Sequence, residues 1–190
     1  MINVLCLHGC NQSEGMFREL MKNYVRLGEK QYNLKFHFME AQYNHPNGGK
    51  TWYNKPLDVK EIGSIVYDEE LTKDALTHLN QVINEYNIDV LLGFSQGANV
   101  VDTFMTHGGH PNIKRVVLMS GYSLIDLSNK MVDTPCLAVI SESDTVVPHI
   151  LNPTNYHESH IFKHYKGHKL PTSNKTIRDI CIFIQTGKCA

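Results

Sequence analysis

Gly93-Phe94-Ser95-Gln96-Gly97 follows the apolar run 88–92 and precedes residues 98–105, whose composition is compatible with a helix. A strand, a serine between two glycines and a helix, in that order, form the turn called a nucleophile elbow, which holds a serine hydroxyl above a sheet edge. Glycine is expected at 93 and 97 because strand and helix pass too closely there for side chains. The pattern also arises by chance, and the alternative is an ordinary turn with a solvent-facing serine.

Size and composition limit the rest of the interpretation. The chain has 190 residues, of which 42% are hydrophobic and 19% charged, with a net charge of −1. These values predict a single globular domain over residues 1–190. Without a basic excess we expect no nucleic-acid partner and no anionic membrane surface as a partner.

Cysteine usage and the N-terminus bear on location. The five cysteines contain no C-x-x-C pair, and three of them lie in apolar runs, so we expect buried thiols in a reducing compartment. Residues 1–7 lack a basic leader, and no apolar stretch approaches the 18 residues of a membrane span. These features predict a cytoplasmic protein, with a nuclear location also compatible.

Strand and helix patterns alternate along the chain. The first predicted helix covers residues 16–25, with Ser13 as its N-cap and Gly28 as its end. The other predicted helices are 67–87, 96–105, a short helix from about Pro148, and a last helix over 177–184. A loop without periodicity covers 41–66. The predicted strands are residues 2–7, 33–39 near a sheet edge, 88–92, 113–119, 135–141 and 159–165. Six strands between helices predict an α/β fold, a doubly wound, mostly parallel sheet with ligands at the carboxyl ends of its strands.

A nucleophilic serine needs a base and an acid that orients the base. Asp144 follows the strand that ends at Ser141, and His168 follows the strand that ends near Tyr165, so both reach the same sheet edge as Ser95. Other acids and histidines compete for these roles. The competing acids are Asp126, Asp133 and Glu142, and the competing histidines are His149, His157, His160 and His164.

The loop after the first strand is expected to lie beside the elbow. His8-Gly9-Cys10 would bring the backbone amide of Cys10 next to that of Gln96, and the two would form an oxyanion hole. The predicted role of the His8 side chain is to support this turn.

These residues resemble a known family. They are similar to the FSH-type serine hydrolases, which include the ovarian tumour suppressor candidate-two proteins. The similar stretches are Leu5–Gly9 with Gln12, Trp52-Tyr53, residues 93–98, Ser143-Asp144 with Val147-Pro148, and Gly167-His168 with Pro171. The resemblance implies an α/β-hydrolase fold without a separate cap domain and esterase activity on acyl esters, with Ser95, Asp144 and His168 as the triad. The residue after His8-Gly9 is often a larger aromatic in this family and is Cys10 here.

The sequence therefore predicts a serine esterase that cleaves short- to medium-chain carboxylic esters without metal or cofactor. An acyl thioesterase, a lysophospholipase-like hydrolase and a non-catalytic binding protein on the same fold are the alternatives. Candidate residues for the acyl pocket are Trp52, Tyr53, Phe94, Tyr122 and Val147. For Trp52 and Tyr53 the competing interpretation is a hydrophobic plug over the core. The sequence alone does not identify the physiological ester or the oligomeric state.

Overall fold

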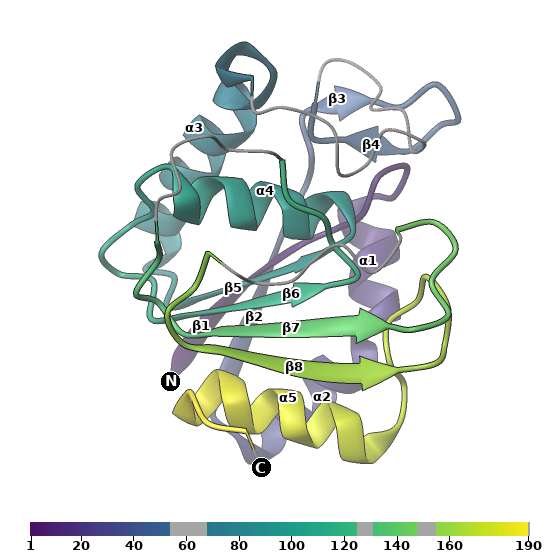
Figure 1. The fold of residues 1–190 in the computed structure, drawn as a ribbon, viewed down its shortest axis with the longest axis vertical. Coiled ribbons are helices and arrows are strands. Elements are labelled where there is room, and N and C mark those ends of the chain that lie inside the picture. The colour runs from purple at the N-terminus through teal and green to yellow at the C-terminus, as the bar shows by residue number, and fades with distance from the viewer. Residues whose placement is uncertain (54–67, 125–130, 148–154, 190) are drawn as a thin grey trace.

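A six-stranded parallel sheet organises the chain in the computed structural model, which describes residues 1–53, 68–124, 131–147 and 155–189 (Figure 1). The strand order is β2-β1-β5-β6-β7-β8, and every neighbouring pair is parallel. The strands are β1 (Ile2–Leu7), β2 (Leu34–Met39), β5 (Val90–Phe94), β6 (Arg115–Met119), β7 (Cys136–Ser141) and β8 (Ser159–His164). This confirms the predicted α/β-hydrolase sheet and places β2 at an edge, as its pattern predicted.

Helices cover both faces of the sheet (Figure 1). They are α1 (Glu14–Leu20), α2 (Lys22–Gln31), α3 (Glu69–Tyr86), α4 (Gln96–Thr106) and α5 (Asn174–Thr186). Side chains of β1 alternate between two cores: Leu5 and Leu7 pack with α3 and α4, whereas Val4 and Cys6 pack with α1, α2 and α5. Burial on both faces explains why residues 4–7 of β1 and all of β5 are continuous apolar runs.

The helix predicted between Ser13 and Gly28 is two helices. Ser13 caps α1 through its hydroxyl, as predicted, but the chain bends at Met21 and α2 continues to Gln31. The prediction that Gly28 ends the helix is wrong. A Cβ on Gly28 would lie 2.6 Å from the Phe36 ring, so this glycine lets α2 pack closely on β2.

The segment predicted to be an unstructured loop contains a short hairpin. β3 (Tyr43–Asn44) and β4 (Lys50–Thr51) pair in antiparallel fashion. Lys50 also forms a β-bridge with Gln12, so the hairpin is attached to the segment after β1. The rest of this predicted loop, over 54–66, and the helix predicted from Pro148 lie outside the described residues.

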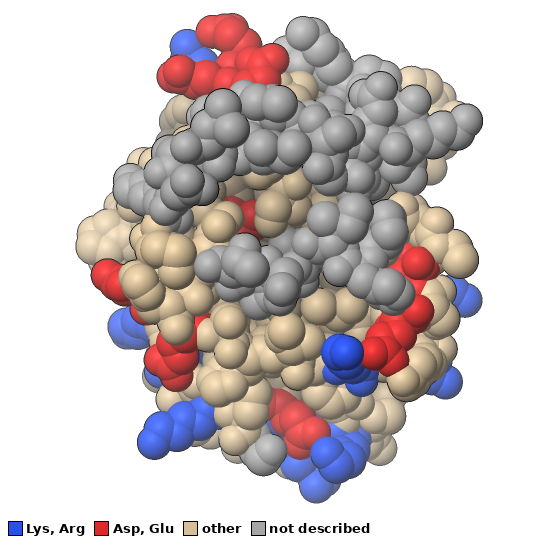
Figure 2. Space-filling model, in the orientation of Figure 1, with Lys and Arg blue, Asp and Glu red and all other residues tan. Residues whose placement is uncertain are grey.

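The surface and the thiols agree with the composition. Acidic and basic side chains are interspersed on the face shown in Figure 2. Cys6, Cys136 and Cys181 are buried and all five cysteines are free thiols. Among the described residues, no helix combines the length and apolarity needed to cross a bilayer.

Candidate active site

The turn between β5 and α4 is strained. Ser95 has φ 54° and ψ −119°, a conformation that costs a non-glycine residue on the order of 1–3 kcal/mol. A Cβ on Gly93 would lie 2.5 Å from the Ala98 Cα, and one on Gly97 would lie 2.6 Å from the His8 carbonyl oxygen. Both glycines are therefore required by close backbone approach, as the sequence predicted, and α4 begins directly against the end of β1.

The Ser95 hydroxyl is directed at His168. A serine at a helix N-cap commonly accepts hydrogen bonds from the first helical amides, but the Ser95 side chain makes no such bond. Its Oγ lies 2.9 Å from His168 Nε2. Ser95 itself is only 8% exposed, and the side chain of His168 is 19% exposed. The hydroxyl and the imidazole thus meet at a shallow, partly solvent-accessible position.

Asp144 completes the chain of hydrogen bonds. Its Oδ2 lies 2.7 Å from His168 Nδ1, and its side chain is 3% exposed. The other oxygen, Oδ1, accepts hydrogen bonds from the backbone amides of Val146 and Val147, each at 2.9 Å. Because the carboxylate can only accept, Nδ1 carries the proton and Nε2 is left to accept from Ser95. This is the tautomer that a general base requires.

The competing acids and histidines in the described residues make no hydrogen bond to Ser95. Asp133 is 97% exposed and close to His157, and Glu142 pairs with Lys163 at 2.9 Å. Of the histidines in the described residues, His168 is the one that hydrogen-bonds Ser95. Asp126 and His149 lie outside the described residues.

The loop after β1 lies against the start of α4. Within the described part of the chain, the amides of Cys10 and Gln96 donate no hydrogen bond. His8 is fully buried: its Nδ1 donates to the Gly9 carbonyl at 2.8 Å and its Nε2 accepts from the Ala41 amide at 3.1 Å. Desolvation lowers the pKa of His8, which favours the neutral ring that these two bonds require.

The predicted pocket residues are buried. Phe94 is 4% exposed, and its ring centroid lies 5.1 Å from that of His168. Tyr122 and Val147 are 4% and 5% exposed. Trp52 and Tyr53 are 0% and 1% exposed, and the Tyr53 hydroxyl donates to Asn99. The burial of this aromatic pair favours the plug interpretation over a binding wall.

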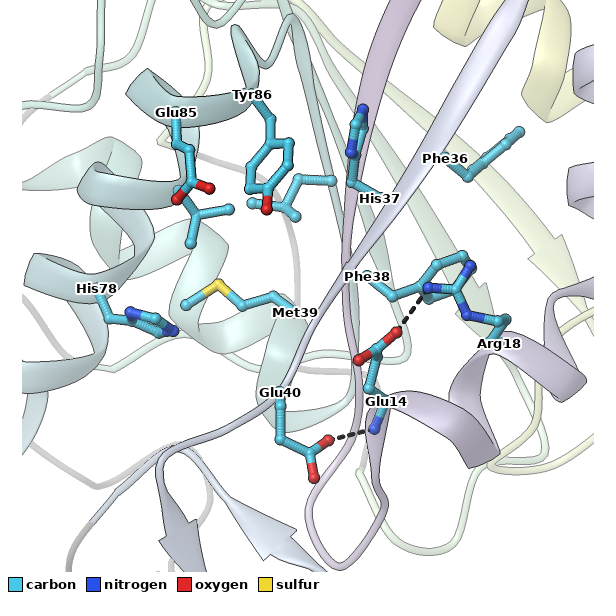
Figure 3. A pocket seen from close by; sticks show the side chains of 12 residues that line it. Glu14, Arg18, Phe36, His37, Phe38, Met39, Glu40, His78, Glu85 and Tyr86 are labelled. Atoms are coloured by element: carbon cyan, nitrogen blue, oxygen red, sulfur yellow. Dashed lines mark hydrogen bonds and ion pairs between the residues drawn. The ribbon is translucent and has the colours of Figure 1, made fainter.

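A separate cavity of about 480 Å³ lies at the outer edge of β2, between α1 and α3 (Figure 3). Charged and imidazole side chains line much of it, among them Glu14, Glu40, His78 and Glu85. The residues around it do not include Ser95, Asp144 or His168. Sequence reasoning did not predict this cavity, because its lining comes from elements that are distant in the chain.

The arrangement of side chains is suited to nucleophilic catalysis. Among the residues that the structure describes, no three His, Cys, Asp or Glu side chains gather as metal ligands would. A serine, a neutral imidazole and a buried carboxylate in series are the groups that acyl transfer requires.

Comparison with solved structures shows proteins of similar fold. The structure resembles SOBER1 from Arabidopsis thaliana (TM-score 0.74, 19% identity, covering 96% of this chain and 97% of that one). It also resembles a carboxylesterase from Mesorhizobium loti (TM-score 0.72, 13% identity, 97% and 88% covered) and esterase PE8 (TM-score 0.66, 18% identity, 96% and 91% covered). At these identities the likeness concerns the fold.

Among curated protein sequences, none is similar enough to count as a match. Residues 1–180 match the family described as serine hydrolase (FSH1). The matched region includes both the elbow and the turn that carries His168. The chain therefore belongs to the FSH1 serine hydrolase family.

Proposed function

We propose that this serine hydrolase cleaves carboxylic esters with short or medium acyl chains through a covalent acyl-enzyme. The observation that carries the proposal is the continuous hydrogen-bonded series Ser95 Oγ, His168 Nε2, His168 Nδ1 and Asp144 Oδ2, at 2.9 Å and 2.7 Å. The three side chains come from the carboxyl ends of β5, β7 and β8, where ligands of open α/β sheets bind.

In this mechanism His168 Nε2 takes the Ser95 proton as Oγ attacks the ester carbonyl. The bond from Oγ to carbon forms, the carbonyl electrons move to oxygen, and a tetrahedral intermediate results. Asp144 holds the imidazole and stabilises its charged form. As the intermediate collapses, His168 returns the proton to the departing alcohol, and the acyl group stays on Ser95. Water then attacks the acyl carbon while His168 takes a proton from it. As this second intermediate collapses, the bond from carbon to Oγ breaks, the acid leaves, and His168 returns the proton to Ser95.

The developing oxyanion would be stabilised by the backbone amides of Cys10 and Gln96. Their donors are free within the described residues, and α4 places the positive end of its dipole at Gln96. Removal of one such donor typically lowers kcat by about 10²–10³-fold.

The proposed preference for short or medium acyl chains rests on the side chains beside His168 and on the segments between the strands. Phe94 contacts the His168 ring, and we expect the buried side chains of Tyr122 and Val147 to extend this apolar surface for the acyl group. Within the described residues, the segments between the sheet strands form α1–α4 and the β3–β4 hairpin and no further inserted lid, so we expect long acyl groups to be covered poorly.

Hydrolysis by a Ser95→Ala variant tests the proposal. We expect p-nitrophenyl butyrate hydrolysis to fall to the background rate while the circular dichroism spectrum and the unfolding midpoint stay close to those of the natural chain. Ser173→Ala, which removes the α5 cap hydroxyl instead, is expected to lose stability and keep its turnover. Undiminished turnover by Ser95→Ala would show that Ser95 is not the nucleophile.

A further inference from the structure

The side chain of Gln96 has a contact that the proposed mechanism does not use. The mechanism needs only the backbone amide of this residue, yet the side chain is buried, with Gln96 3% exposed overall. Its Oε1 accepts hydrogen bonds from the Thr51 hydroxyl at 3.0 Å and the Trp52 amide at 3.1 Å. The residue that begins α4 therefore binds the last residue of the β3–β4 hairpin, Thr51, and the residue after it, Trp52.

Trp52 continues this connection to the loop after β1. Its indole Nε1 donates to the His8 carbonyl oxygen at 2.8 Å, and its ring centroid lies 5.1 Å from that of His8. The other end of the same peptide is also held, because the Gly9 amide donates to Gln12 Oε1 at 2.9 Å. The peptide between His8 and Gly9 is thus fixed at both its oxygen and its nitrogen.

The next peptide, between Gly9 and Cys10, carries the second oxyanion donor. Its carbonyl oxygen accepts from His8 Nδ1 at 2.8 Å and from the Gln12 amide at 3.3 Å. The peptides of the described chain are trans, so C=O and N–H of one peptide point in opposite directions. Holding the Gly9 carbonyl therefore fixes the direction of the Cys10 N–H, which glycine would otherwise allow to rotate.

We propose that Gln96 and Trp52 are positioning residues. Their hydrogen bonds through the Thr51–Trp52 segment hold the peptide between His8 and Gly9, and thereby keep the Cys10 amide that follows it in a fixed relation to the Gln96 amide. Gln96 then acts twice, with its amide as one donor and with its side chain as the anchor of the other. The inference rests on the proposed function, because it concerns the oxyanion hole of that reaction.

Two variants break the connection at different points. Gln96→Met removes the Oε1 acceptor and keeps the backbone amide and side-chain length. Trp52→Phe removes the Nε1 donor and keeps an aromatic ring in the core. Since loss of a whole oxyanion donor costs about 10²–10³-fold, we expect loss of its alignment to lower kcat by roughly 10- to 100-fold, with KM changed less than about threefold.

The matched control is Tyr156→Phe. It also removes a buried donor, the hydroxyl that bonds Asp102 at 3.1 Å, without touching the loop after β1. We expect this control to lower the unfolding midpoint and leave kcat unchanged. Thr51→Val, which removes one of the two bonds to Gln96, provides a milder variant in case Gln96→Met does not fold, and its kcat is expected to fall by less.

A trifluoromethyl ketone that forms a tetrahedral adduct with Ser95 supplies a second readout. Its inhibition constant should rise by about the factor by which kcat falls, since the adduct needs the same donors. The double variant Gln96→Met/Trp52→Phe should lose about as much as the more affected single variant, because both break one connection.

Normal kcat and normal inhibitor affinity in folded Gln96→Met and Trp52→Phe would overturn the inference while the esterase proposal stands. The inference would also be overturned if the losses of kcat in Gln96→Met and Trp52→Phe were no larger than the loss in Tyr156→Phe. A natural chain without esterase activity, by contrast, would remove the proposed function and this inference with it.

Discussion

Replacing Gly97 by alanine tests how closely the start of α4 must approach β1. A Cβ at this position would lie 2.6 Å from the His8 carbonyl oxygen and 2.7 Å from the Leu7 carbonyl carbon. Carbon and carbonyl oxygen normally stay about 3.3 Å apart, so the two backbones must separate by about 0.7 Å or more. Such overpacking typically costs about 1–3 kcal/mol of unfolding free energy.

The same displacement moves the Gln96 amide away from the Cys10 amide. A misplacement of about 1 Å in a catalytic site lowers the rate by roughly 10²-fold, so we expect kcat/KM of Gly97→Ala to fall by about that factor. Urea unfolding gives the stability, and hydrolysis of p-nitrophenyl butyrate gives the activity, both measured on the same preparation.

Gly15→Ala is the matched control. A Cβ at Gly15, in α1, meets nothing within 4 Å, so alanine should stabilise the chain by up to about 1 kcal/mol and leave activity unchanged. If Gly97→Ala retained both the stability and the turnover of the natural chain, the argument from close backbone approach would be refuted.

Three further predictions concern the acid, a buried carboxyl and the substrate. Asp144→Asn would present an amide N–H to His168 Nδ1, force the proton onto Nε2 and lower kcat by about 10⁴-fold in steady-state assays; a loss below tenfold would contradict the tautomer argument. Desolvation raises the pKa of Asp102 above its ordinary value of 3.8, so the stability gained from its proton is present below about pH 4 and is lost as pH rises. Asp102→Asn should therefore gain unfolding free energy relative to the natural chain between pH 4 and pH 7, whereas a pH-independent difference would refute this assignment. In a panel of p-nitrophenyl esters, turnover should favour short and medium acyl chains, and a preference restricted to very long chains would contradict the proposed substrate class.

The parallel α/β sheet and the approach of Ser95, Asp144 and His168 to one another followed from local sequence signals. Ser95, Asp144 and His168 each come just after an apolar run, and the carboxyl ends of parallel strands meet at one edge. Gly93 has a steric reason within the elbow itself, because a Cβ there would meet Gly97 and Ala98, whereas a Cβ on Gly97 would meet Leu7 and His8, which are distant in the chain. The sheet, the elbow and Gly93 were predictable because each depends on a few neighbours in the chain.

Features that depend on distant contacts were missed. Glycine is typical of a helix end, but Gly28 lies inside α2. A glycine is needed there because the Phe36 ring occupies the space that a side chain at position 28 would fill. The two-residue strands β3 and β4 are too short to show periodicity, and one of them is also bridged to Gln12.

The contacts of Trp52 and Gln96 could not be predicted for the same reason. The sequence signal at Gln96 concerned its backbone amide, and nothing near it in the chain indicates that its side chain accepts from Thr51 and Trp52. For the aromatic pair Trp52-Tyr53 the sequence left both a plug over the core and a binding wall open, and the burial of both rings favours the plug; their hydrogen-bond partners, more than 40 residues away, were not predictable.

Labelling with a fluorophosphonate probe, followed by mass spectrometry of the digested protein, tests the central claim most directly. The account predicts a single adduct on Ser95, formed by the folded natural chain, strongly slowed in His168→Ala and absent from Ser95→Ala. A folded natural chain that carries no adduct on Ser95, or a Ser95→Ala variant that is labelled equally well, would contradict it.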